Sequence, residues 1–289
     1  MSNSETSNLR GILFMLGAVV AFSLMDVCLK LLSPHYPAMQ VAALRGLTSL
    51  PLVLLWIAFT GGFARVRSRL WHLHLLRGVL AVLMLSSFAF ALRDLPLAEA
   101  YSLFFVAPLL VTALAVPLLG ERVGWRRWVA ILIGLAGVLV VLRPDAARMS
   151  NLGSVAVLVA AVSYALSAIT VRVLGRTEST QSMVFWMISL LTLFAVASAW
   201  NHWVHVRFED WPILLTLAIS GALGQYAITE AFKHSDASIV APFDYTALIW
   251  GIGFDWLIWH TTPDRMMLFG ASIIVASGLY LIRRDRAIA

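Results

Sequence analysis

Residues 97–119 read LAEAYSLFFVAPLLVTALAVPLL and carry a single charge, on Glu99. A hydrocarbon core of about 30 Å is crossed by roughly 20 residues of helix, and only a helix or a closed barrel satisfies its own backbone polar groups there. Barrel strands are about half as long and alternate apolar with polar residues, which this stretch does not. The stretch therefore predicts a membrane-spanning helix.

Nine further apolar stretches run along the chain, bounded by short clusters of Arg, Asp, Pro or Gly. With 97–119, the predicted spans are 11–32, 37–61, 74–92, 97–119, 126–142, 153–174, 181–200, 211–230, 237–259 and 267–282. The composition agrees, because 61% hydrophobic and 12% charged residues leave too little polar surface to cover a globule of 289 residues in water. We predict an all-α membrane protein of ten transmembrane helices, with loops too short for a separate catalytic domain.

The distribution of Lys and Arg predicts the orientation. Ten crossings place both termini on one side, and that side holds thirteen of the 21 cations against five on the other. Cytoplasmic loops are enriched in Lys and Arg, so both termini are predicted to be cytoplasmic. The remaining three cations, Lys30, Arg45 and Arg77, lie within spans. The only cysteine, Cys28, excludes an internal disulfide and suggests no thiol metal site.

Matches between the two halves indicate an internal duplication. At an offset of 142 residues the pairs are Leu24 with Leu166, Lys30 with Arg172 and Leu32 with Leu174. At an offset of 140 residues, Ala107 meets Ala247. Because each half has an odd number of spans, the second copy enters the membrane inverted, as in many transporters. The predicted repeats are residues 11–142 and 153–282.

Several longer stretches are informative together. They are FSLMDVCLKLLS (22–33), LHLLRG (73–78), LRDLPLAEAYSLFFVAPLLVTALAVPLLGERVGWRRWVAILIGLAGVLVVLRP (92–144), RTEST (176–180), SIVAPFDYTALIWG (238–251) and ASIIVASGLYLIRRD (271–285). Over essentially its whole length the chain resembles bacterial EamA-type members of the drug/metabolite transporter superfamily, most specifically in 92–144. The resemblance implies two inverted five-helix repeats around a central substrate cavity.

Ionisable residues inside the spans are the first candidates for a site, since each costs several kcal/mol in lipid unless it is paired or faces a cavity. Asp26 and Lys30 are one helical turn apart, so they form either a self-neutralising pair at the outer interface or a charged lining of the outer vestibule. Arg45 lies deep in the second span. It either pairs with Glu99 or offers its guanidinium to a substrate carboxylate.

Asp244 is the strongest acidic candidate. It follows Pro242 and precedes Tyr245, so a proline-loosened turn presents a carboxylate and a phenol together. The alternative is a carboxylate that only packs between helices. Tyr101 lies in the inverted counterpart of this segment, in the span 97–119.

Further polar and aromatic side chains within spans suit an amphipathic small molecule. They are Tyr164, Trp186 and Gln225. Arg77, near the cytoplasmic end of its span, is expected to contact lipid headgroups or Glu121.

Mixed Arg and Asp residues suit a zwitterion, and with the resemblance they imply an inner-membrane carrier that works by alternating access. Export of an amino acid or amino-acid-derived compound, including opine-type metallophores, is the first expectation. Similar proteins take up S-adenosylmethionine or riboflavin, so import is the alternative. A membrane-embedded enzyme is disfavoured, because the sequence has no HExxH, GxSxG or Cys–His pair. Expected partners are the substrate and the bilayer, with no nucleic acid, cofactor or metal, in a monomer or weak homodimer.

Overall fold

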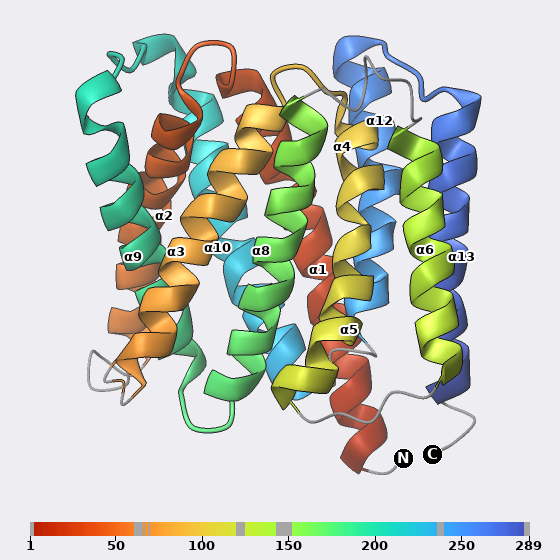
Figure 1. Cartoon of the computed structure of the whole chain (residues 1–289). Coiled ribbons are helices and arrows are strands. Elements are labelled where there is room, and N and C mark those ends of the chain that lie inside the picture. The colour runs from red at the N-terminus through yellow and green to blue at the C-terminus, as the bar shows by residue number, and fades with distance from the viewer. Residues whose placement is uncertain are drawn as a thin grey trace.

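A computed structural model describes residues 3–60, 66, 68, 70–119, 125–142, 152–235 and 240–285. Within these ranges every regular element is a helix, and the helices stand side by side as a bundle (Figure 1). The first helix begins, and the last one ends, at the lower end of the bundle in Figure 1. We refer to this end as the lower end and to the opposite one as the upper end.

Successive spans run in alternating directions between the two ends, with α4 and α5 forming one span and η4 and α12 forming another. The first half contains α1 (Asn3–Leu32), α2 (Ala38–Thr60), α3 (Trp71–Ala91), α4 (Leu97–Phe104), α5 (Val106–Leu119) and α6 (Trp125–Leu142). The second half contains α8 (Leu152–Leu174), α9 (Thr180–Ala199), α10 (Trp211–His234), the 3-10 helix η4 (Ala241–Thr246), α12 (Ala247–Trp259) and α13 (Arg265–Asp285). Two short 3-10 turns, η2 (Trp200–His202) and η3 (Phe208–Asp210), connect α9 to α10.

Seven stretches of the described residues are helical, long enough and apolar enough to cross a membrane. They are Leu9–Leu32, Ala38–Thr60, Trp71–Ala91, Leu97–Leu119, Leu152–Leu174, Thr180–His202 and Phe208–His234. Each coincides with a span predicted from the sequence, so the chain is a multi-pass membrane protein. The count of ten crossings and the inverted repeats stay predictions, since α12 has 13 residues and Arg265–Ser277 is also a short apolar helix.

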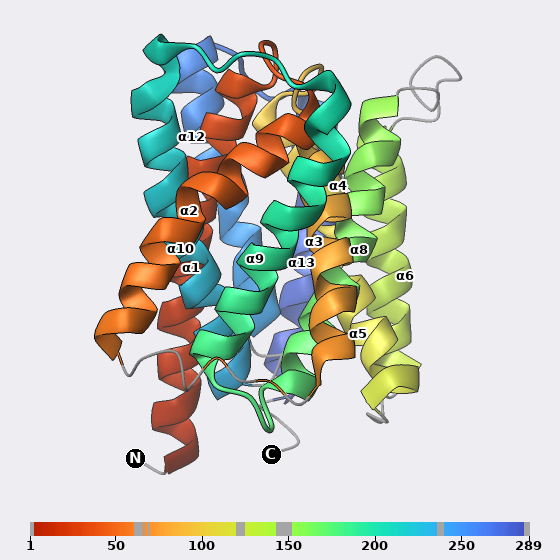
Figure 2. The same ribbon diagram turned by 90° about the vertical axis from the view of Figure 1, so that its left-hand side faces the viewer.

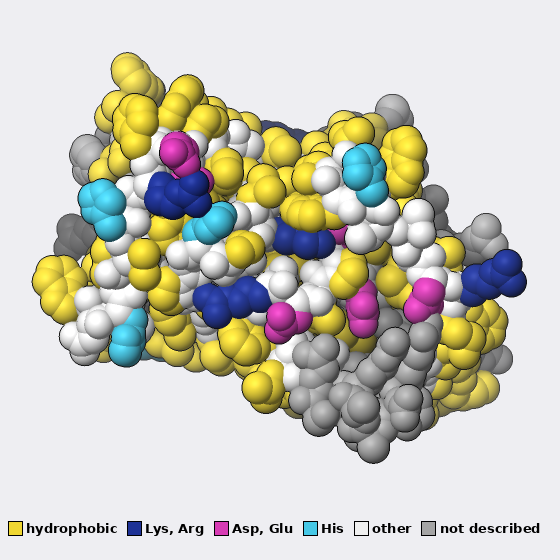
Figure 3. Space-filling view, turned by 90° about the horizontal axis from the view of Figure 1, so that it is seen from above, with side chains coloured by type: hydrophobic (Ala, Val, Ile, Leu, Met, Phe, Trp, Pro, Cys, Tyr) yellow, Lys and Arg dark blue, Asp and Glu magenta, His cyan; other side chains and the backbone are white. Residues whose placement is uncertain are grey.

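The outside of the bundle is apolar. Phe59, Leu132 and Ile249 are 86%, 63% and 71% exposed, which in water would favour aggregation but suits contact with lipid tails. Exposed aromatic residues lie near both ends: Trp71 and Trp125 at the lower one, and Trp200, Trp203, Phe208 and Trp211 at the upper one. Such belts mark the two membrane interfaces. On the upper face, charged and histidine side chains gather among hydrophobic ones (Figure 3).

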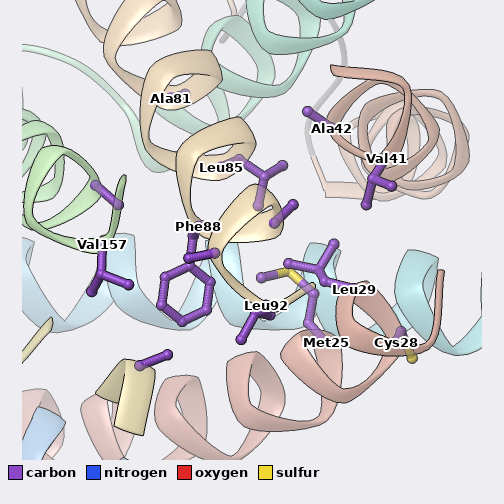
Figure 4. Packing of buried hydrophobic residues seen from close by; sticks show 14 of the residues in the cluster. Met25, Cys28, Leu29, Val41, Ala42, Ala81, Leu85, Phe88, Leu92 and Val157 are labelled. Carbon is purple, nitrogen blue, oxygen red and sulfur yellow. The ribbon is translucent and has the colours of Figure 1, made fainter. Parts of the chain in front are cut away.

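Helix pairs from the two halves build the core. The closest packing is of α1 on α10, α3 on α8, α2 on α9 and α6 on α13; α2 and α9 face the viewer in Figure 2. Buried residues of α1, α2, α3 and α8, among them Cys28, meet in the centre (Figure 4). A Cβ on Gly46 would lie 2.3 Å from Oγ1 of Thr192, so the lack of a side chain allows α2 to approach α9 closely.

Two helical spans are interrupted inside the bundle. The helix over 97–119 breaks at Phe105, between α4 and α5, and the span that ends in α12 contains the 3-10 turn η4 directly before that helix. The ring of Phe105 packs edge-on against the ring of Tyr245, with centroids 5.1 Å apart. These two residues are separated by the same offset of 140 that relates the halves of the sequence. The two interruptions therefore touch each other.

Candidate functional site

A cavity of about 140 Å³ lies among the interrupted helices and their neighbours. Most of its lining is apolar, including Phe22, Phe88 and Phe104. Six of the ten site residues expected from the sequence line it: Asp26, Arg45, Tyr101, Tyr164, Gln225 and Asp244. The structure therefore gathers side chains from α1, α2, α4, α8, α10 and η4 around one space.

Towards the upper end, the cavity wall carries a carboxylate, a phenol and a guanidinium. The hydroxyl of Tyr101 donates a hydrogen bond of 2.8 Å to Oδ2 of Asp26. Arg45 lies within electrostatic reach of Asp26, and its Nε donates to Sδ of Met25 at 3.0 Å. We call Asp26, Arg45 and Tyr101 the upper layer.

Towards the lower end, a second set has the same composition. The hydroxyl of Tyr164 donates to Oδ2 of Asp244 at 2.7 Å. Arg77, on α3, also lines the cavity and donates from Nη1 to the carbonyl oxygen of Met183 at 3.1 Å. We call Asp244, Tyr164 and Arg77 the lower layer. Gln225 lines the cavity as well, and its Nε2 donates to Thr229 at 3.4 Å.

The expected pairing of Asp26 with Lys30 is not formed. Lys30 instead makes an ion pair of 2.9 Å with Asp255, and its ammonium lies 4.1 Å from the ring centroid of Trp259. Asp255 also accepts hydrogen bonds from the backbone N–H groups of Leu97 and Ala98, at 3.2 and 2.8 Å. The carboxylate of Asp255 thus caps the positive N-terminus of α4 and neutralises Lys30. Asp26 is therefore not paired with Lys30 and accepts a hydrogen bond from Tyr101 instead.

The structure does not show the pairing of Arg45 with Glu99, which is one of the two alternatives given for Arg45 above. Its neighbours are Met25 and Asp26, and Glu99 is not its partner. Glu99 is half-buried in the first turn of α4 and has an interaction of its own. Arg45 is reached instead by Asp26, because both side chains point into the cavity from α2 and α1.

Two further candidates lie outside the cavity lining. Trp186 donates from Nε1 to the carbonyl of Val66 at 2.9 Å and packs against His74 near the lower end. Tyr245 is buried against Phe105. Adjacent residues of a 3-10 turn point about 120° apart, so Asp244 and Tyr245 cannot both face the same space.

Polar contacts cross the bundle below the cavity. Glu178 accepts hydrogen bonds from Ser68 at 2.7 Å and from Ser182 at 2.8 Å, and its carboxylate lies 3.8 Å from Nε2 of His74. Nearby, Thr180 donates to Glu230. These contacts join α3, α9 and α10 at the lower end.

A separate group joins the connections at the upper end. The hydroxyl of Tyr36 donates to Asp210 at 2.5 Å and accepts from the backbone N–H of Arg207 at 3.0 Å. Arg93 donates to the carbonyl of Tyr36 at 2.8 Å. Burial, followed by the bond donated to Asp210, raises the pKa of the Tyr36 hydroxyl above its usual range. The hydroxyl therefore stays protonated and acts as a donor.

Of the four described charged residues that line the cavity, Arg77 is the one not included among the site residues expected from the sequence. Its position near the end of α3 suggested headgroup contact or a bond to Glu121, which lies outside the described residues. The sequence nevertheless contains a sign that Arg77 faces the cavity, since a cation inside a span needs either a charged partner or a cavity. Within the described ranges, no cluster of three or more His, Cys, Asp or Glu side chains could hold a metal ion.

The sequence matches the EamA-like transporter family twice, over residues 9–143 and 151–284. The chain belongs to this family. Among curated proteins, this EamA-family chain is 30% identical over 277 residues to the pseudopaline exporter CntI of Pseudomonas aeruginosa strain PAO1, covering 96% of the chain and 97% of that protein. It is 28% identical to the S-adenosylmethionine uptake transporter of Rickettsia prowazekii, over 99% of the chain and 97% of that protein.

A third relative is the riboflavin transporter of Vibrio cholerae, 30% identical with 97% of this EamA-family chain and 98% of that protein covered. One solved crystal structure has a TM-score of 0.68 at 20% identity, covering 95% of the chain and 98% of the other, which shows a shared fold. The family and the named relatives indicate a transporter of a small molecule and not an enzyme.

Proposed function

We propose that this protein is an inner-membrane carrier that exports a small amino-acid-like or amino-acid-derived metabolite, such as an opine-type metallophore, by alternating access. The observation that carries the proposal is the composition of the cavity: two arginines and two aspartates line a mainly apolar space inside the bundle. Buried charges of both signs are costly unless they bind something complementary. A zwitterion offers both a carboxylate for a guanidinium and an ammonium for a carboxylate.

The arrangement of the helices supports a mechanism with two inverted repeats, residues 11–142 and 153–282. The family matches each half separately, over 9–143 and 151–284. Exchange of the halves turns the packing of α1 on α10 into that of α8 on α3, and leaves the pairs α2 with α9 and α6 with α13 unchanged. Such a relation is expected for a pseudo-two-fold axis in the membrane plane. Rocking of one half against the other would open the cavity to each side in turn.

The volume of the cavity also favours alternating access. About 140 Å³ is close to the volume of a cavity that holds benzene. Movement of the walls in alternating access would widen this space for a metabolite with more atoms than benzene. We propose a monomer or weak homodimer, since the cavity is built from one chain.

The direction of transport has two candidates, export and import. The likeness to a protein named as an exporter favours export, whereas the relatives named as uptake transporters favour import of S-adenosylmethionine or riboflavin. The excess of cations on the side of the termini supports a cytoplasmic lower end.

The test is metabolite profiling of cells and medium, with the gene deleted, restored, and restored as Asp244→Asn. An exporter leaves its substrate in the cells on deletion and depletes the medium, and only the unaltered gene reverses this. The opposite distribution would establish import. An unchanged profile of all amino-acid-like compounds in both compartments would contradict the proposal.

A further inference from the structure

The cavity contains two buried arginines at different depths. Arg45 lies in α2, which begins at the upper end at Ala38, and Arg77 lies in α3, which begins at the lower end at Trp71. At 1.5 Å of rise per residue, each Cα is about 10 Å from its own end of the bundle. In a membrane core of about 30 Å, roughly 10 Å of depth therefore separates the two.

Both arginines have an N–H donor without an acceptor among the described residues. These donors are Nη1 of Arg45 and Nε of Arg77, on side chains that are 1% and 2% exposed. The two aspartates differ, because each already accepts a hydrogen bond from a tyrosine hydroxyl. A buried donor that lacks an acceptor is costly. What both layers lack is therefore an acceptor, preferably an anionic one.

We infer that the substrate is a linear amino acid that carries a second carboxylate at its far end, with one carboxylate bound by Arg45 and the other by Arg77. This inference rests on the proposed carrier function and names its substrate class. In the upper layer, Asp26 beside Arg45 receives the ammonium group while Arg45 binds the α-carboxylate. In the lower layer, the guanidinium of Arg77 binds the distal carboxylate, for which its planar fork is well suited. Arg77 then determines which far-end group is accepted.

The experiment measures binding to the purified full-length protein in lipid nanodiscs. Three probes have the same seven-carbon chain and differ only at the far end: 2-aminoheptanedioate with a carboxylate, 2-aminoheptanoate with a methyl group, and 2,7-diaminoheptanoate with an ammonium. We expect 2-aminoheptanedioate to bind at least tenfold more tightly than the other two. Arg77→Gln should remove this preference, so that 2-aminoheptanedioate binds no more tightly than 2-aminoheptanoate.

Two further variants keep the result interpretable. Arg77→Lys preserves the charge but not the fork, so it should fold if Arg77→Gln does not and should retain only part of the preference. Arg176→Gln removes an exposed arginine between α8 and α9 and should change nothing.

The failures are distinguishable. If 2-aminoheptanedioate and 2-aminoheptanoate bind equally and Arg77 variants alter neither, the second carboxylate is refuted and the zwitterion carrier stands. Tightest binding of 2,7-diaminoheptanoate would likewise overturn the inference, because the lower layer would then recognise a cation through Asp244. If none of the three binds to folded protein, both the inference and the amino-acid-like substrate class are refuted.

Discussion

At the scale of single residues, the cavity wall contains two hydrogen bonds of the same kind, each from a tyrosine hydroxyl to an aspartate. Tyr101 donates to Asp26 and Tyr164 donates to Asp244, one bond in each half of the chain. The order is reversed between the halves: the carboxylate is on α1 and the phenol on α4 in the first, and the phenol is on α8 and the carboxylate on η4 in the second. A ligand ammonium that displaces either phenol would change how helices of that half are held together.

Asp244→Asn tests the lower of these bonds. The amide is nearly isosteric and can still accept a hydrogen bond from Tyr164, so we expect the variant to fold. Because the amide lacks the negative charge, we expect transport to be lowered tenfold or more, equivalent to about 1.4 kcal/mol. Uptake or efflux of the identified substrate in proteoliposomes is the measurement. Tyr245→Phe is the matched control, since that buried hydroxyl has no partner among the described residues and its removal should leave transport near normal. Normal transport by Asp244→Asn would mean that the carboxylate only packs.

Arg45 gives a second test, in which the two possible acidic neighbours are compared. Arg45→Gln leaves Asp26 without its nearby cation, and we expect a loss of about 3 kcal/mol in stability together with loss of transport. Adding Asp26→Asn should restore thermal stability in detergent but not transport. Adding Glu99→Gln should restore neither, because Glu99 is engaged elsewhere. Rescue by Glu99→Gln would show that Arg45 and Glu99 are partners after all.

At the scale of helices, α4 depends on a side chain from α12. Its N-cap is Pro96, which provides no side-chain hydrogen bond, and the backbone N–H groups of Leu97 and Ala98 bond to Asp255 instead. The same carboxylate holds Lys30 of α1. One buried group thus connects three helices from both halves near the upper end.

Asp255→Asn should therefore destabilise the protein by about 3 kcal/mol, because it leaves Lys30 unpaired and weakens the cap of α4. Lys30→Gln should cost less, since Asp255 keeps its two backbone donors. Thermal unfolding of both variants and of the double variant gives the coupling between the two residues. Equal effects of the two single variants would contradict a capping role for Asp255.

The hydrogen bond from Tyr36 to Asp210 joins the connection between α1 and α2 to the connection between α9 and α10 at the upper end. Tyr36→Phe removes the donor to a buried carboxylate, and we expect a loss of about 1–3 kcal/mol near neutral pH. Because the pKa of Tyr36 is raised in the folded state, the hydroxyl contributes fully below pH ~10 and its contribution is lost as the pH rises through the folded-state pKa. The difference in melting temperature between wild type and Tyr36→Phe should shrink accordingly. A difference that stays constant up to pH ~11 would argue against this contact.

Much of this element structure follows from the sequence, for a simple reason. Length and hydropathy locate spans because the membrane imposes both, so the seven long helices coincide with predicted spans. The interruption near Asp244 was indicated by Pro242. Pairing was harder to foresee: Lys30 binds Asp255, 225 residues away, and not Asp26, one turn away. Which face of a span points inwards depends on tertiary packing, which also explains why Arg77 was expected at headgroups.

At the scale of the whole molecule, the orientation in the membrane is open to a direct test. The lone cysteine is buried, so Cys28→Ala provides a background without thiols. Asn201→Cys then marks the upper end and Thr177→Cys the lower end, both at exposed positions. We expect a membrane-impermeant thiol reagent to label Asn201→Cys in spheroplasts and Thr177→Cys only after lysis, because the cation excess predicts a cytoplasmic lower end. Labelling of Thr177→Cys alone before lysis would reverse the orientation, and labelling of both would refute the alternation of the spans.

The edge-on contact between Phe105 and Tyr245 lies where α12 could tilt relative to the other helices. From Ala247, just above this contact, α12 extends 13 residues to Trp259, a lever of about 20 Å. A rotation of roughly 10° about the aromatic pair would displace Asp255, about 12 Å along the helix, by about 2 Å, which is enough to break a hydrogen bond. The bond between Lys30 and Asp255 lies near the far end of that lever. If α12 tilts about the two rings during transport, a small change of angle at the centre of the bundle would therefore separate Asp255 from Lys30 at the upper end.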